Sequence, residues 1–173
     1  MGKPGQPKRV LFFIATLFKD EEIYYLTRRI IIECFGDTIL ESAKKYWDYS
    51  KYYSAELGEP IFRKFMFFKN LISEADISDI KLQTNQIEEK LSTNGKRTIN
   101  IDPGYIGLSK LVLATTKDYS HRIYLKDGIY GEVTLIFQDN SFRPYINTYR
   151  DYADREYITL FNLMRFIYKD MFC

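Results

Sequence analysis

The sequence is poor in the residues from which metal centres and disulfide frameworks are built. Its 173 residues include two cysteines and one histidine. Cys34 and Cys173 follow no metal-ligand or disulfide spacing, so we expect two free thiols and no zinc site. No apolar run is long enough to span a membrane, and none precedes the first strand as a signal peptide would. We therefore expect no membrane partner and a cytoplasmic location.

Motifs of classical nucleotide and acyl hydrolysis are also lacking. Residues 94–98 (NGKRT) are similar to the end of a phosphate-binding loop, but the required earlier glycine is missing and a helix is predicted where a strand should precede. No Gly-x-Ser-x-Gly elbow occurs. The net charge of +2 is close to neutral, which disfavours nucleic acid as a partner without excluding it. The sequence indicates no particular cofactor.

Aromatic side chains, in contrast, are abundant. The chain has 15 Tyr and 13 Phe, and its 46% hydrophobic and 28% charged residues have the balance of an ordinary globular protein. Glycine and proline predict a flexible leader over residues 1–8. Because a chain of this length has one hydrophobic core by default, we expect a single α+β domain over residues 9–173.

Hydrophobic patterning predicts a mixed or antiparallel sheet. Residues 10–17 are nearly all apolar, as is typical of a buried central strand, and residues 61–68 have strand composition. Residues 98–101 alternate as a short strand, which we expect to end in a turn at residues 102–104. Residues 108–116 fit either a strand or one or two helical turns.

Capping signals predict about three helices. The first begins at Asp20 and ends at Gly36. Ser73 caps the second and Asp154 the last. The expected apolar stripe of the first helix consists of Ile23, Leu26, Ile30 and Cys34. This order of strands and helices fits a ferredoxin-like core followed by a C-terminal hairpin and helix.

The clearest local signal is a hairpin. Residues 121–125 and 129–137 read as strands on either side of Asp127 and Gly128, which suit a type I′ turn. Residues 141–152 are polar, aromatic and interrupted by proline, and they predict a loop over the surface.

This turn sets which side chains share a face of the hairpin. Counting from it, His121 and Glu132 become diagonal neighbours. A carboxylate so placed can orient an imidazole or hold it charged, as in a general acid–base pair. A hydrogen-bonded structural pair is the alternative. Arg122 is expected on the opposite face, towards solvent.

Asp102 and Tyr105 form a second candidate group. They could place a carboxylate and a phenol at the mouth of a sheet, although a β-turn whose Asp bonds the backbone is the commoner use of such residues. Lys117 and Arg122 could contact an anion. Scattered surface charge explains these basic residues equally well.

Residues 99–137 (INIDPGYIGLSKLVLATTKDYSHRIYLKDGIYGEVTLIF) resemble the signature block of a prokaryotic family called domain of unknown function 4416. The likeness extends to residues 20–22, 52–58, 62–68 and 142–165. Some members are labelled GTP-binding proteins, a label for which this chain carries no motif. The resemblance implies these characteristic polar residues: Asp102, Tyr105, Lys117, His121, Arg122, Tyr130, Glu132 and Asp151. Residues 146–150 depart from the Trp and Pro that family members tend to carry there.

Two functions of different classes remain. The first is a ligand-binding or catalytic domain for a small anionic metabolite or nucleotide, with His121 and Glu132 as the acid–base pair and Asp102 as the orienting residue. Its expected ligand contacts are Lys117, Arg122, Tyr105, Tyr130 and Asp151. The second is a non-enzymatic module that binds protein or RNA through exposed aromatics. These are Tyr46, Trp47, Tyr49, Tyr52 and Tyr53, for which completing the core is the favoured interpretation. Enzymatic activity and oligomeric state stay open.

Overall fold

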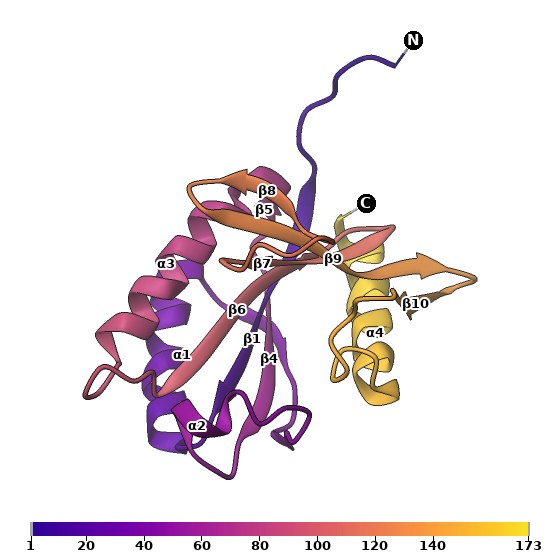
Figure 1. Ribbon diagram of the computed structural model, residues 1–173. Helices are drawn as coiled ribbons and strands as arrows, with labels where there is room; N and C mark the ends of the chain where they lie inside the picture. Colours follow the sequence, from indigo (N-terminus) through magenta and orange to yellow (C-terminus); the bar gives the residue numbers. More distant parts are fainter. Residues whose placement is uncertain (1, 173) are drawn as a thin grey trace.

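The protein is an antiparallel sheet with helices on both faces (Figure 1). It is seen here in a computed structural model that describes residues 2–172. The strands in these residues are β1 (Arg9–Phe18), β2 (Thr38–Glu41), β3 (Lys45–Tyr46), β4 (Phe62–Phe68), β5 (Ile72–Ser73), β6 (Ile99–Ile106), β7 (Lys110–Thr115), β8 (Ile123–Lys126), β9 (Ile129–Gln138) and β10 (Ser141–Pro144). The main path runs in the order β10-β9-β7-β6-β1-β4-β2, and β3, β5 and β8 attach to β4, β1 and β9.

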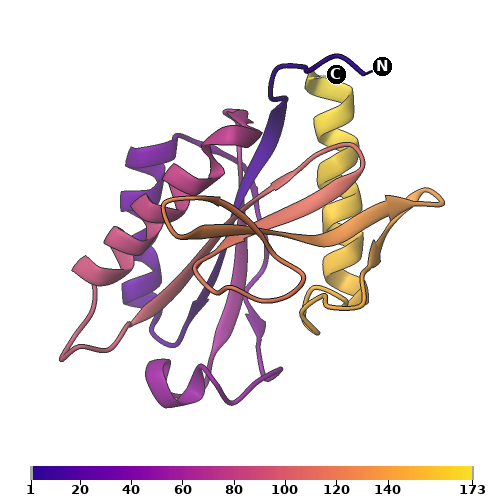
Figure 2. The same ribbon diagram turned by 45° about the horizontal axis from the view of Figure 1, so that its top comes forward.

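The helices sandwich this sheet. They are α1 (Glu21–Phe35), the short α2 (Ser54–Leu57), α3 (Ile77–Lys90), preceded by a 3₁₀ turn over Glu74–Asp76, and α4 (Arg155–Phe172). The helices α1 and α3 lie on one face and α4 on the other (Figures 1 and 2). The predicted single α+β domain with a C-terminal hairpin and helix is confirmed.

Two finer expectations, the ferredoxin-like core and the flexible leader, remain predictions. The elements β1, α1, β2, β4, α3 and β6 follow one another as βαββαβ, and their strands are neighbours in the order β6-β1-β4-β2. Whether this unit is a ferredoxin-like core stays a prediction, because β7, β9 and β10 extend the same sheet beyond it. Residues 2–8 have no regular secondary structure and are exposed. The rest of the predicted leader, residue 1, lies outside the described residues.

Strand β1 is apolar except for Arg9 and Thr16, because both of its faces are covered. Phe13 packs with Phe65 and Phe161 in the core beneath α4. Phe12 and Ile14 point the other way, into the core shared with α1 and α3. Since burying each such side chain contributes about 1.5–3 kcal/mol, this strand anchors the two hydrophobic layers.

The predicted stripe of helix α1 is half right, because Ile23 and Ile30 pack against the core and Leu26 and Cys34 do not. The buried residues of α1 are Tyr24, Thr27 and Ile31, whereas Leu26 is 37% exposed and Cys34 is exposed. Tyr24 decides this orientation, because its ring stacks on Phe18 at 4.5 Å while its hydroxyl donates to Glu41. Cys34 is a free thiol as predicted. The same prediction for Cys173 lies outside the described residues.

The predicted helix caps are in place. Asp20 accepts the N–H of Glu22, and Gly36 ends α1 with a φ of 91°. Ser73 accepts the N–H of Ala75 at the start of the 3₁₀ turn before α3. At α4, Asp154 Oδ1 accepts the N–H of Glu156 at 2.9 Å.

Asp154→Ala is expected to lower the free energy of unfolding by about 1–2 kcal/mol, because the cap is lost. Partial burial opposes its charge, but hydrogen bonds from Tyr49, the Glu156 N–H and Lys45 hold the pKa of Asp154 below its ordinary 3.8. Its stabilisation is therefore present at neutral pH and fades as the pH falls below about 4. Urea unfolding of the wild type and of Asp154→Ala at pH 7 and pH 3 measures the difference in their free energies of unfolding. Asp154→Asn, which keeps a capping oxygen, is the control. A difference that is larger at pH 3 than at pH 7 would contradict the assignment.

The hairpin turn is confirmed. Asp127 and Gly128 have φ values of 52° and 75°, as a type I′ turn requires, and Lys126 pairs with Ile129. Regular β8 begins only at Ile123, so His121 and Arg122 precede it rather than form part of it.

Two predicted loops are instead strand. Strand β6 continues through residues 102–104, so no turn forms there. The glycine that suggested a turn serves close packing, because Phe13 and the Val112 carbonyl occupy the space of a Cβ on Gly104. Within residues 141–152, the first four form β10, joined to β9 through Asp139 and Asn140, both with positive φ. Residues 108–116, left open between strand and helix, contain β7.

Candidate functional site

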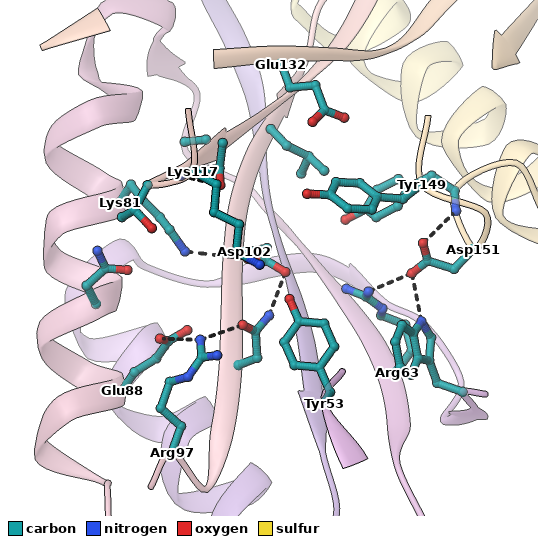
Figure 3. A pocket seen from close by; sticks show the side chains of 18 residues that line it. Tyr53, Arg63, Lys81, Glu88, Arg97, Asp102, Lys117, Glu132, Tyr149 and Asp151 are labelled. Atoms are coloured by element: carbon teal, nitrogen blue, oxygen red, sulfur yellow. Dashed lines mark hydrogen bonds and ion pairs between the residues drawn. The ribbon is translucent and has the colours of Figure 1, made fainter. Parts of the chain in front are cut away.

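A cavity of about 250 Å³ opens where β6 and β7 separate (Figure 3). Strand β6 pairs with β1 over its whole length but with β7 only over residues 104–106. Pro103, the next residue, has no N–H to donate to a neighbouring strand. The cavity is lined by Trp47, Tyr53, Arg63, Lys81, Asn85, Glu88, Arg97, Asn100, Asp102, Leu113, Ala114, Thr115, Thr116, Lys117, Glu132, Tyr149, Asp151 and Tyr152. Four segments of sheet, α3 and the segment before α4 thus contribute to one site.

His121 and Glu132 are in contact as predicted, although the count along the hairpin is wrong, because a bulge at Leu125 shifts the β8–β9 register by one residue. His121 Nε2 lies 3.2 Å from Glu132 Oε2, and Thr134 donates to Oε1 at 3.2 Å. Arg122 Nε also donates to Oε2, at 2.9 Å. The expectation that Arg122 faces solvent on the opposite side is wrong, since the register shift at Leu125 brings Arg122 to the side of Glu132, where it is buried. Glu132 lines the cavity, whereas His121 is not among its lining residues.

Asp102 points into the cavity from the part of β6 that does not pair with β7 (Figure 3). Its Oδ2 accepts a hydrogen bond from Asn100 Nδ2 at 2.6 Å, and its Oδ1 lies 3.5 Å from Lys81 Nζ. Lys81 is itself buried on α3 and donates to the Ile101 carbonyl at 2.9 Å. Asp102 and Glu132 therefore share the cavity wall.

Asp151 is tied to a residue that sequence reasoning missed. Its Oδ2 accepts from Arg63 NH2 at 2.6 Å and from Trp47 Nε1 at 2.9 Å, and its Oδ1 accepts the Tyr152 N–H at 3.0 Å. Arg63 is 4% exposed, and its Nε and NH1 have no hydrogen-bond partner in residues 2–172. In Figure 3 the Arg63 guanidinium lies between Asp151 and the middle of the cavity.

A further cluster of charged residues, centred on Arg97, forms the end of the cavity next to α3. Arg97 makes two hydrogen bonds to Glu56 and donates to Glu88 and Asn100. Glu88 also accepts the backbone N–H of Ile101. Burial raises the pKa of Glu88 above its ordinary value, against the opposing pull of Lys81, the Ile101 N–H and Arg97. Burial, with the charge of Asp102, also raises the pKa of Tyr53.

The remaining predicted residues divide between the cavity and other places. Lys117 lines the cavity, and its Nζ lies 4.3 Å from the centre of the Tyr52 ring. Tyr105 is buried in another hydrophobic cluster, and Tyr130 packs edge-on against Tyr124; neither is a lining residue. The structure thus brings Asp102, Lys117, Glu132 and Asp151 together at the cavity wall. His121 and Arg122 contact Glu132 but do not line the cavity.

One sequence signal could have pointed to Arg63. It is one of two adjacent basic residues, with Lys64, in the otherwise apolar strand β4, and a charge within a buried strand needs a partner. That partner is 88 residues away in the sequence, so spacing does not reveal it.

The alternative aromatic surface is only partly exposed. Tyr46 and Tyr52 are 55% and 57% exposed, but Trp47 is 5% exposed and forms part of a core cluster. Tyr49 and Tyr53 are half-buried against that cluster. For Trp47 the favoured interpretation, that it completes the core, is confirmed, and the alternative that it is exposed is wrong.

Within residues 2–172 no helix is long and apolar enough to cross a membrane, and no three His, Cys, Asp or Glu residues gather as a metal site. No curated protein and no solved structure matches the chain. A family model matches residues 8–168, and the chain therefore belongs to the family described as Domain of unknown function (DUF4416).

Proposed function

We propose that the cavity between β6 and β7 binds a small anionic metabolite, whose carboxylate or phosphate is received by Arg63 with help from Lys117. The observation that carries this proposal is the bonding state of Arg63. Its guanidinium is buried on the cavity wall, one edge pairs with Asp151, and Nε and NH1 make no hydrogen bond in the described residues.

A buried donor without an acceptor is costly, by about 1–3 kcal/mol and more for a charged group. Trp47, Phe65 and Tyr152 surround the guanidinium at 5.6–6.0 Å and stabilise its charge, but ring faces do not replace directed hydrogen bonds. An anion oxygen could accept a hydrogen bond from Nε or from NH1, or from one of them together with NH2, which also bonds Asp151. Binding would therefore complete a group that folding leaves incomplete.

Lys117 is a second cation for such an anion. Within residues 2–172 it makes no ion pair within 4.0 Å, in contrast to Lys81 and Arg97, which line the same cavity. Its ammonium lies over the Tyr52 ring instead. A lysine without an ion pair at the wall of a small cavity can approach an anion without first breaking a salt bridge.

The geometry favours binding over acid–base catalysis by His121 and Glu132. Both oxygens of Glu132 accept hydrogen bonds, and Arg122 already balances its charge. His121 reaches the cavity only through Glu132. A catalytic role for this pair remains a prediction, tested by the loss of ligand turnover in His121→Ala.

Calorimetric titration with succinate and with inorganic phosphate tests the binding proposal. We expect saturable binding that weakens roughly tenfold or more in Arg63→Lys, because lysine keeps the charge beside Asp151 but not the guanidinium fork. Arg143→Lys, at an exposed arginine on β10, is the matched control and should bind as the wild type does. Equal affinities for wild type and Arg63→Lys, or no saturation at millimolar anion, would refute the proposal.

A further inference from the structure

We infer that the ligand of this cavity is a small anion that also carries a hydroxyl group, and that Asp102 accepts a hydrogen bond from this hydroxyl. The inference rests on the proposed anion site and adds the chemistry of the ligand's other end. It follows from comparing the carboxylates that line the cavity.

Four carboxylates line the cavity, and three of them are fully engaged. Both oxygens of Glu132, of Asp151 and of Glu88 accept at least one hydrogen bond from the protein. Asp102 differs, because only its Oδ2 accepts one, from Asn100. Its Oδ1 lies 3.5 Å from Lys81 Nζ, which is longer than the usual 2.7–3.2 Å of such a hydrogen bond.

Asp102 is also the most accessible of the four. Its side chain is 27% exposed, against 3%, 4% and 6% for Glu132, Asp151 and Glu88. The exposed part lies at the cavity, where β7 has left β6. A carboxylate with one free oxygen, held in place through the other, is a directed acceptor for a donor on a ligand.

The charges around Asp102 select a neutral donor. Lys81 already lies beside the free oxygen, and Lys117 lines the same cavity. A ligand ammonium at this position would be repelled by both lysines, whereas a hydroxyl gains the hydrogen bond without that repulsion. Hydroxyl-bearing anions are therefore favoured over amino acids.

The size and walls of the cavity agree with a short polar chain. Its 250 Å³ equals roughly eight water molecules at about 30 Å³ each. Tyr53, Tyr149 and Tyr152 supply ring surface for the carbon skeleton between the two polar ends. A short hydroxy acid and a phosphorylated polyol share this chemistry.

Two sets of near-isosteric probes test the inference. Succinate, L-malate and L-aspartate differ by hydrogen, hydroxyl and ammonium on one carbon. Glycerol 3-phosphate and propyl phosphate form the phosphate set. By calorimetry we expect the hydroxyl-bearing member of at least one set to bind roughly tenfold tighter than its unsubstituted partner, and aspartate to bind no tighter than succinate. The set with the larger ratio identifies the anionic group.

Asp102→Ala should bring the ratio of malate to succinate affinity, or of the two phosphates, to about one. Affinity for the unsubstituted anion should be kept or increased, since the variant frees the charge of Lys81. A folding defect would weaken both members alike, so the ratio isolates the hydrogen bond. Asp37→Ala, at an exposed aspartate after α1, should retain the wild-type ratio.

The outcomes separate this inference from the proposal beneath it. If no probe binds, the anion site itself is refuted. If anions bind in an Arg63-dependent way but hydroxylated and plain probes bind alike, or aspartate binds tightest, the anion site stands and the hydroxyl inference is overturned. A ratio that survives in Asp102→Ala also overturns it.

Discussion

Asp151→Asn is expected to lower the free energy of unfolding by about 3–5 kcal/mol, the cost of leaving a buried charge without its counter-ion. Asp151 and Arg63 have side chains that are each 4% exposed, and they meet at 2.6 Å. Asparagine keeps the size of the side chain and one acceptor oxygen, so the effect combines the lost charge with one lost acceptor, such as that of the Tyr152 N–H. Urea unfolding followed by circular dichroism at pH 7 measures it.

A double-mutant cycle with Arg63→Met identifies the cause. Removing both charges should cost less than the sum of the two single changes by 1 kcal/mol or more, on the order of coupling expected for a buried pair. Asp37→Asn, in an exposed pair with Lys69, should leave stability unchanged within error. Additive single effects would mean that the two groups do not stabilise each other.

Gly104→Ala is expected to destabilise the protein by about 3 kcal/mol or to prevent folding. A Cβ at this position would lie 2.6 Å from both the Phe13 ring and the carbonyl oxygen of Val112. The ring belongs to the core beneath α4 and the carbonyl to the neighbouring strand, so neither can retreat without disturbing the sheet. Thermal and urea unfolding of the purified variant measure the loss.

Gly107→Ala is the matched control for this close approach. Gly107 follows β6 directly, and a Cβ there would meet only the Lys110 carbonyl at 3.7 Å, an ordinary contact. We expect its stability to stay within about 1 kcal/mol of the wild type. Equal stability of the two alanine variants would show that the sheet adjusts freely at Gly104.

Local chemistry made much of the fold predictable. The caps at Asp20 and Asp154 and the Asp127–Gly128 turn depend on neighbouring residues, and all three are confirmed. Positions where a distant partner decides the structure were mispredicted. Gly104 was expected in a turn, but it is constrained by the Phe13 ring, which is more than ninety positions earlier in the sequence. Tyr24 sets which face of α1 is buried, through contacts with β1 and β2.

The candidate site divides in the same way. The turn at Asp127 and Gly128 is local and brings the segment of His121 close to Glu132, so the sequence predicts that contact. The same count put Arg122 on the wrong side, because the bulge at Leu125 shifts the register by one residue and no local signal marks it. Arg63 and Trp47 were not recognised as site residues, since their shared partner Asp151 is reached only through the tertiary fold.

The separation of 88 residues between Arg63 and Asp151 has a consequence for biosynthesis. A nascent chain that has emerged only through β9 would hold most of the sheet but lack the segment that closes the cavity and fixes the guanidinium. If the cavity binds an anion as proposed, this ability would arise late, together with the docking of α4. A metabolite present during translation would act on the last folding steps, holding the completed chain in its closed form by mass action.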